Sequence, residues 1–138
     1  MTIHSLGYLG VITQDLEAWR AFGTDVLGLQ DVSNSDTEAK SVYLKMDDAP
    51  WRLLIESGDA DQLALCGWEV VSEAALHALS EKLTEAGTAW SWASDEHCTQ
   101  RCVQQMIEFQ DPSGIRHEAY WGRVSDFAVF NSPVGVAG

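Results

Sequence analysis

Two stretches of equal length, TQDLEAWRAFGTDVLG at residues 13–28 and SEAALHALSEKLTEAG at residues 72–87, decide the fold. Each begins with candidate helix N-caps, Thr13 or Asp15 in the first and Ser72 in the second, and ends at a glycine, the residue that commonly follows a helix C-terminus. Between these ends, apolar residues recur every three or four positions, as they do on one face of an amphipathic helix. The pattern predicts two similar helices, one in each half of an internally repeated chain.

Strand patterns flank both helices in the same order. Runs rich in branched and aromatic residues surround the first helix and are separated by polar turns such as Asp47-Asp48-Ala49-Pro50. In the second half, Asp111-Pro112-Ser113-Gly114 forms the turn between the last two strands. In the strand 41–46 we expect Val42, Leu44 and Met46 to share one face. The expected strands are 3–13, a short one near Leu29, 41–46, 51–56, 63–71, 90–92, 103–109 and 115–121, with a hairpin loop over 31–40.

This order predicts an α+β fold of two β-α-β-β-β modules, at about residues 3–57 and 62–122. Each module alone would expose strand edges and an apolar sheet face, and pairing of the modules covers both. We expect a curved mixed sheet with a concave cleft, which is a usual place for a ligand. Residues 1–125 would form a single domain, and residues 126–138 a C-terminal tail or the start of a linker.

The charge balance excludes whole classes of partner. Eight Lys and Arg residues against 21 Asp and Glu residues give a net charge of −13, which repels nucleic acid and anionic membrane surfaces. No apolar run is long enough to span a bilayer and no secretion signal opens the chain, which favours a cytoplasmic location. Three cysteines, Cys66, Cys98 and Cys102, cannot all pair within one chain, as is typical of a reducing compartment.

Several short motifs carry a family resemblance through their order and spacing. They are Leu6-Gly7-Tyr8, DLEAWR at 15–20, DVLGL at 25–29, APWR at 49–52, GWEV at 67–70, DPSG at 111–114 and EAYWG at 118–122. Together they resemble the N-terminal domain of type I extradiol ring-cleavage dioxygenases of the 2,3-dihydroxybiphenyl dioxygenase type. These enzymes belong to the vicinal oxygen chelate superfamily, with glyoxalases and bleomycin resistance proteins, and the resemblance implies its glyoxalase-like fold.

The resemblance implies an enzymatic activity that lies in another domain. Family enzymes open catecholic rings with Fe(II) and O2, and their second domain holds the iron through two histidines and a glutamate. The corresponding ligand positions of this chain are Tyr8, Leu65 and Glu118, of which only the glutamate suits the metal. The chain alone is therefore expected to be inactive, with no cofactor of its own and a structural or assembly role. Its expected partners are a C-terminal catalytic domain or further copies of itself.

A second hypothesis is a metal-free binding protein of the bleomycin-resistance type, which would hold an aromatic small molecule. Trp51 and Trp68 are expected on strands that face the cleft, where a planar ligand could stack, and Glu118 would supply a rim charge. Packing in the core is the alternative use for these tryptophans. A third hypothesis, a metal-dependent glyoxalase-like isomerase, requires metal ligands that this sequence lacks.

The remaining metal-ligand residues indicate no familiar site. His97, Cys98 and Cys102 provide three zinc ligands in one short turn, whereas a structural zinc site needs four. His97 is expected on a surface loop, and the other histidines, His4 and His77, at the surface as well. His117 should face away from Glu118, because adjacent strand residues point to opposite faces. Glu118 is expected to be exposed or paired with Arg116, two residues before it on the same face.

Overall fold

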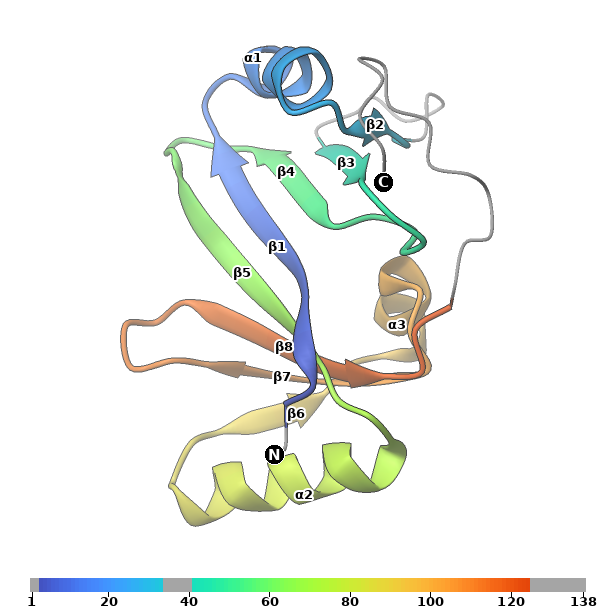
Figure 1. The fold of residues 1–138 in the computed structure, drawn as a ribbon. Helices are drawn as coiled ribbons and strands as arrows, with labels where there is room; N and C mark the ends of the chain where they lie inside the picture. The colour runs from blue at the N-terminus through green and yellow to red at the C-terminus, as the bar shows by residue number, and fades with distance from the viewer. Residues whose placement is uncertain (1–2, 34–40, 125–138) are drawn as a thin grey trace. The chain divides into compact units, whose positions relative to one another are not determined.

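The computed structural model describes residues 3–33 and 41–124, which fall into two compact units. The first unit holds the described residues from 8 to 64, and the second holds residues 65–124 with residues 3–7. The elements are β1 (Ser5–Thr13), α1 (Leu16–Ala21), the π-helical segment η1 (Phe22–Val26), β2 (Gln30–Asp31), β3 (Ser41–Lys45), β4 (Leu53–Ser57), β5 (Gln62–Glu69), α2 (Glu73–Glu85), β6 (Trp90–Trp92), α3 (Asp95–Arg101), β7 (Gln105–Gln110) and β8 (Arg116–Trp121) (Figure 1).

The predicted α+β fold of two β-α-β-β-β modules is confirmed by this order. In the first unit the strands are arranged β2-β3-β4-β1, with β4 parallel to β1 and the other neighbours antiparallel. In the second unit the arrangement is β5-β8-β7-β6, again with one parallel pair, β5 with β8. The expected tail at 126–138 lies outside the described residues, as does most of the loop at 31–40. The concave cleft between the modules stays a prediction.

The first helix begins where the sequence predicts. The Asp15 carboxylate accepts a hydrogen bond from the backbone N–H of Ala18 at 3.0 Å, and α1 starts at the next residue after this cap. The helix widens into η1 and finishes before Gly28, which has a left-handed φ of 73°. Gly23 lies in η1 against Leu44, where an added Cβ would come within 2.6 Å of the leucine Cδ1. The π-helical turn was not indicated by the sequence.

Two expectations for the first unit are wrong in detail. Trp51 precedes β4 and does not lie in it, because that strand begins only at Leu53. In β3, Val42 and Leu44 are buried as expected, but Met46 is 45% exposed, since the strand ends at Lys45 and Met46 belongs to the following turn. The core of this unit is formed by Leu29, Val42, Leu44 and Ile55, with Leu16 and Trp19 of α1 packed against them.

In the second unit, the helices α2 and α3 lie on opposite faces of the sheet. The Ser72 hydroxyl caps α2, and Leu76 of this helix packs in the core with Ile107 and Ala119. Because side chains alternate along a strand, Glu108 and Glu118 point to the other face, where α3 lies. None of the helices in the described ranges is long and apolar enough to cross a membrane.

Candidate functional site

Two glutamates face each other across the hairpin of β7 and β8. Glu108 and Glu118 are register partners, and the Glu118 residue is fully buried, with 0% exposure. Like charges directly opposite on neighbouring strands repel, and a buried carboxylate is costly unless it is paired and hydrogen-bonded. This position therefore requires positive charge from the surrounding structure.

Arg101 supplies the closest counter-charge. Its Nε donates to Glu118 Oε1 at 2.8 Å and its Nη2 donates to Oε2 at 3.2 Å, which is the two-pronged geometry of a strong guanidinium–carboxylate pair. The Arg101 side chain is only 8% exposed. It comes from the last turn of α3, a helix whose N-terminus is capped by the Ser94 hydroxyl and whose C-terminus is followed by Cys102 at a left-handed φ of 62°.

Arg116, which lies in β8, donates hydrogen bonds to both glutamates. Its Nη2 donates to Glu118 Oε2 at 2.8 Å and to Glu108 Oε1 at 2.6 Å. The expected pairing of Arg116 with Glu118 is thus present, because residues two apart share a strand face. The carboxylates of both glutamates are neutralised by guanidiniums of this same unit.

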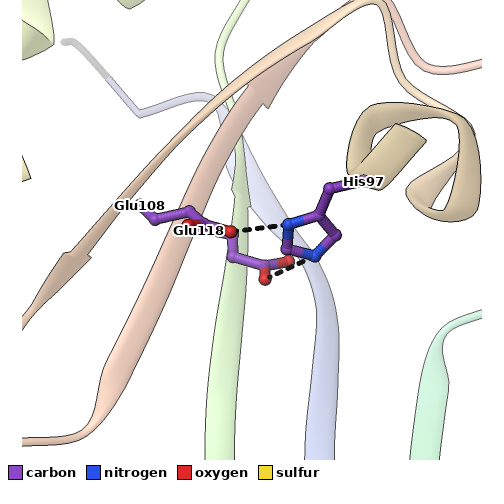
Figure 2. A group of neighbouring side chains, drawn as sticks. All are labelled: His97, Glu108 and Glu118. Atoms are coloured by element: carbon purple, nitrogen blue, oxygen red, sulfur yellow. Dashed lines mark ion pairs between the residues drawn. The ribbon is translucent and has the colours of Figure 1, made fainter. Parts of the chain in front are cut away.

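His97 completes the group from one turn before Arg101 on α3. Its Nδ1 lies 2.6 Å from Glu108 Oε1 and its Nε2 lies 3.5 Å from Glu118 Oε2, so the imidazole contacts both carboxylates (Figure 2). The placement of His97 on a surface loop was wrong, since Asp95–Arg101 is a helix and the imidazole is only 20% exposed. We call His97, Arg101, Glu108, Arg116 and Glu118 the charge cluster.

Three members of the charge cluster could hold a metal ion. His97, Glu108 and Glu118 each offer a ligand atom, and these atoms lie within 4.8 Å of one another. The carboxylate oxygens, however, already accept hydrogen bonds from Arg101 and Arg116. A metal ion would have to compete with these guanidiniums for the carboxylate oxygens and bind beside their positive charge.

The other two ligand positions implied by the resemblance carry no such group. Tyr8 is buried in the first unit, with its ring centroid 4.7 Å from that of Trp51. Leu65 is buried in β5 of the second unit and has no donor atom. Of the three positions, Glu118 alone bears a group typical of an iron ligand.

The two tryptophans proposed as ligand contacts already make aromatic contacts within their own units. Trp51 is 7% exposed and contacts both Tyr8 and Tyr43, at centroid distances of 4.7 and 5.2 Å. Trp68 is half-buried, stacks on the His117 ring at 6.1 Å and donates its indole N–H to His117 Nδ1 at 2.8 Å. Core packing thus accounts for Trp51.

His117 lies on the face opposite Glu118, as expected. Its Nδ1 accepts from Trp68, so in the neutral ring the proton is on Nε2, which faces Asp111 Oδ2 at 3.0 Å. The hydrogen bond from His117 lowers the pKa of the Asp111 carboxyl. Both ring nitrogens of His117 are therefore engaged within the second unit.

Among the described residues, the group of possible metal ligands includes no cysteine. Cys98 is buried, and burial raises the pKa of its thiol, with a further contribution from the Asp95 carboxylate. A thiol with a raised pKa stays protonated at neutral pH and is a poor metal ligand. The group of ligand atoms around His97 consists of carboxylates, without Cys98 or Cys102.

A groove of about 680 Å³ opens beside the charge cluster in the second unit. Trp90 and Phe109 supply its aromatic wall, and Glu108 and Arg116 belong to both the groove and the charge cluster. Sequence reasoning identified neither Arg101 nor Glu108. The position of Glu108 could be predicted from the sequence, because counting outward from the turn at residues 111–114 places it opposite Glu118.

Comparison with known proteins relates the chain to extradiol dioxygenases. The family model "Dihydroxybiphenyl dioxygenase BphC D1" matches residues 6–58. An iron-dependent extradiol dioxygenase of Rhodococcus jostii is 38% identical over 135 residues, which are 98% of this chain and 44% of that protein. A 3-methylcatechol 2,3-dioxygenase of Pseudomonas putida is 38% identical over 139 residues, covering 100% of this chain and 47% of that protein.

Solved structures agree with these relatives. A catechol 2,3-dioxygenase superposes with a TM-score of 0.90 at 32% identity, over 99% of this chain and 48% of the other. A halotolerant catechol dioxygenase, BphC, gives a TM-score of 0.88 at 32% identity, over 95% of this chain and 43% of the other. The chain spans less than half the length of each of these proteins. It is homologous to the N-terminal part of extradiol dioxygenases, over the length of one domain of the vicinal oxygen chelate fold.

Proposed function

We propose that this chain acts as the non-catalytic N-terminal domain of an extradiol dioxygenase, supporting a catalytic domain that opens catecholic rings. One observation carries the proposal: Tyr8 and Leu65 stand where iron-binding histidines would be needed, in a chain that spans less than half of its relatives. Fe(II), which would activate O2 and a chelated diol in the catalytic domain, requires neutral imidazoles beside a carboxylate.

The charge cluster does not replace those missing ligands. It offers a single imidazole, and both of its carboxylates are engaged by guanidiniums. Such a set does not fit the two-histidine, one-carboxylate arrangement that suits Fe(II). In this proposal the cluster is structural and ties α3 to the sheet of the second unit, while the iron belongs to the longer enzyme.

A domain exchange tests this role directly. The matching N-terminal region of the Pseudomonas putida 3-methylcatechol 2,3-dioxygenase would be replaced by this chain. We expect the chimera to contain iron and to give the yellow ring-opened product, whereas the catalytic half alone loses activity and this chain alone shows neither property. Ring opening by the isolated chain, abolished in Glu118→Gln and His97→Ala, would refute the proposal.

Binding of an aromatic small molecule is a second candidate function, favoured by the groove beside Trp90 and Phe109. Of the contacts proposed from the sequence, Trp68 is half-buried, whereas Trp51 and Glu118 are buried and already contact other side chains. A tryptophan-fluorescence titration with 2,3-dihydroxybiphenyl, and in parallel with a cationic aromatic drug, measures it. Saturable quenching at micromolar ligand that weakens in Trp68→Phe and Trp90→Phe supports this function, and quenching that never saturates argues against it.

A further inference from the structure

Three side chains of the charge cluster are arranged as metal ligands would be. The same cluster also contains two arginines, which act as counter-cations for its carboxylates. His97, Glu108 and Glu118 bring their ligand atoms within 4.8 Å of one another, which is close enough for one ion to reach all three. Two guanidiniums, those of Arg101 and Arg116, bind the same carboxylate oxygens. The positive charge that an ion would bring is therefore already present.

Arg101 is suited to be a permanent substitute for such an ion. Its guanidinium stays protonated at every pH that a protein survives, and its planar fork engages both oxygens of Glu118. It is also nearly as buried as its partner, so the pair is little screened by water or salt. Arg116, with a side chain 42% exposed, gives the second and more accessible counter-charge.

A divalent cation would compete with these guanidiniums, for both chemical and electrostatic reasons. The ion needs oxygen lone pairs that the arginine N–H groups occupy, and it would sit within a few ångströms of two positive charges in a buried place. Without the arginines, the same imidazole and carboxylates form a set that Zn²⁺ accepts.

We propose that His97, Glu108 and Glu118 form a latent divalent-metal site that Arg101 and Arg116 keep closed by acting as resident counter-cations. The native chain then folds without a metal, and loss of Arg101 converts the cluster into a site for one divalent cation such as Zn²⁺. This inference concerns the second unit itself and does not depend on the proposed role in a longer enzyme.

The test compares the native chain with Arg101→Gln after removal of metal by EDTA. Glutamine keeps a polar side chain but cannot neutralise Glu118. We expect Zn²⁺ to leave the melting temperature of the native chain unchanged and to raise that of Arg101→Gln by about 5 °C or more at saturation. Calorimetric titration should show one Zn²⁺ per variant chain and no comparable site in the native chain.

Three further variants isolate the cause. Arg101→Lys keeps a cation and should stay insensitive to Zn²⁺, whereas adding His97→Ala to Arg101→Gln removes a ligand and should abolish the Zn²⁺ response. Arg20→Gln is the matched control, because Arg20 pairs with Asp31 in the first unit and is not a member of the charge cluster. That variant should lose stability without gaining sensitivity to Zn²⁺.

Two results would overturn the proposal. One is stoichiometric Zn²⁺ binding by the native chain that disappears in His97→Ala. The other is an Arg101→Gln chain that folds but ignores Zn²⁺.

Failure of Arg101→Gln to fold, with or without Zn²⁺, leaves two decisive measurements. The more exposed Arg116→Gln should then gain weaker, His97-dependent Zn²⁺ binding, and absence of any gain contradicts the latent site. The double variant Arg101→Met with Glu118→Gln, which removes both charges, should recover folding. If it does not recover, Arg101 acts through something other than the charge of Glu118, and the counter-cation role is wrong.

Discussion

The two modules share a plan, but at one matched pair of positions the second module carries charged side chains where the first carries uncharged ones. In the second module, Glu118 of β8 faces Glu108 of β7; in the first, Leu54 of β4 faces Tyr43 of β3. The preceding turns are alike, since Asp47 accepts a hydrogen bond from the N–H of Ala49 as Asp111 does from that of Ser113. The two modules therefore have similar turns and strands, whereas the side chains paired on the sheet face differ between them.

The arginines of the two modules show the same contrast. Arg52 of the first module pairs with Asp47 of its own turn, through Nε and Nη2. Arg116, at the equivalent place in the second, instead joins Glu108 to Glu118. Within the described residues, only the second module has a helix between its second and third strands, and this helix adds Arg101. In the second module the buried carboxylate is tolerable because α3 brings a cation to it.

Removing that cation should have the largest effect. In Arg101→Met the buried Glu118 loses its two-pronged partner, and we expect the free energy of unfolding to fall by about 3–5 kcal/mol. Urea unfolding at neutral pH measures the loss. Arg101→Met combined with Glu118→Leu imitates the apolar first module and should be close to native, so a double variant as unstable as the single one would contradict this account.

The matched position of the first module should respond as an ordinary core residue. Leu54 is 2% exposed, and Leu54→Ala should cost about 3 kcal/mol through the cavity that it leaves. The cost should not change between pH 5 and pH 8, as no charge is involved. Urea unfolding measures this cost at each pH. A cost that changes markedly with pH would contradict the view that this position of the first module involves no charge.

The N-terminal caps of α1 and α2 should contribute equally to the stability of the two modules. Asp15 caps α1 and Ser72 caps α2, each by accepting a backbone N–H three residues on. We expect Asp15→Ala and Ser72→Ala each to lower the free energy of unfolding by about 1 kcal/mol. Urea titrations of the two variants can be compared with Ser57→Ala, which removes a strand hydroxyl and no cap. A loss confined to one cap would break the equivalence.

The smallest expected effect is a pH dependence in the first module. Burial alone would raise the pKa of Asp31, but hydrogen bonds from Ser33 and Arg20 outweigh it and lower that pKa below the ordinary 3.8. A lowered carboxyl pKa means that the stabilisation is fully present above pH 3.8 and is lost as pH falls through the lowered value. Since the pair is partly exposed, Asp31→Asn should remove less than about 1 kcal/mol at neutral pH.

Unfolding midpoints in urea from neutral to acid pH follow this loss. The difference between the native chain and Asp31→Asn should shrink as the pH falls. A difference that grows toward acid pH would reverse the assigned sign.

Much of the fold was readable from local patterns because their causes are local. A capping hydroxyl or carboxylate, a glycine at positive φ and a run of alternating residues act within a few positions, so the boundaries near Asp15, Gly28, Ser72 and Gly87 followed directly. The helix α3 was missed, since seven residues without an apolar stripe are too short to be stable alone. Its signals were Ser94 three residues before His97, and the four-residue spacing from His97 to Arg101.

Local sequence was therefore sufficient for the repeat, the helix ends, the strands and the family, because each rests on neighbours along the chain. The local sequence could not predict what the Glu118 carboxylate binds. Its partners come from α3 and from its own strand β8. Whether it binds a metal, faces water or pairs with Arg101 depends on which charges the folded sheet and α3 bring within hydrogen-bonding distance. Electrostatic contacts of buried groups are set by such long-range placement, since burial strengthens them and makes each missing partner costly.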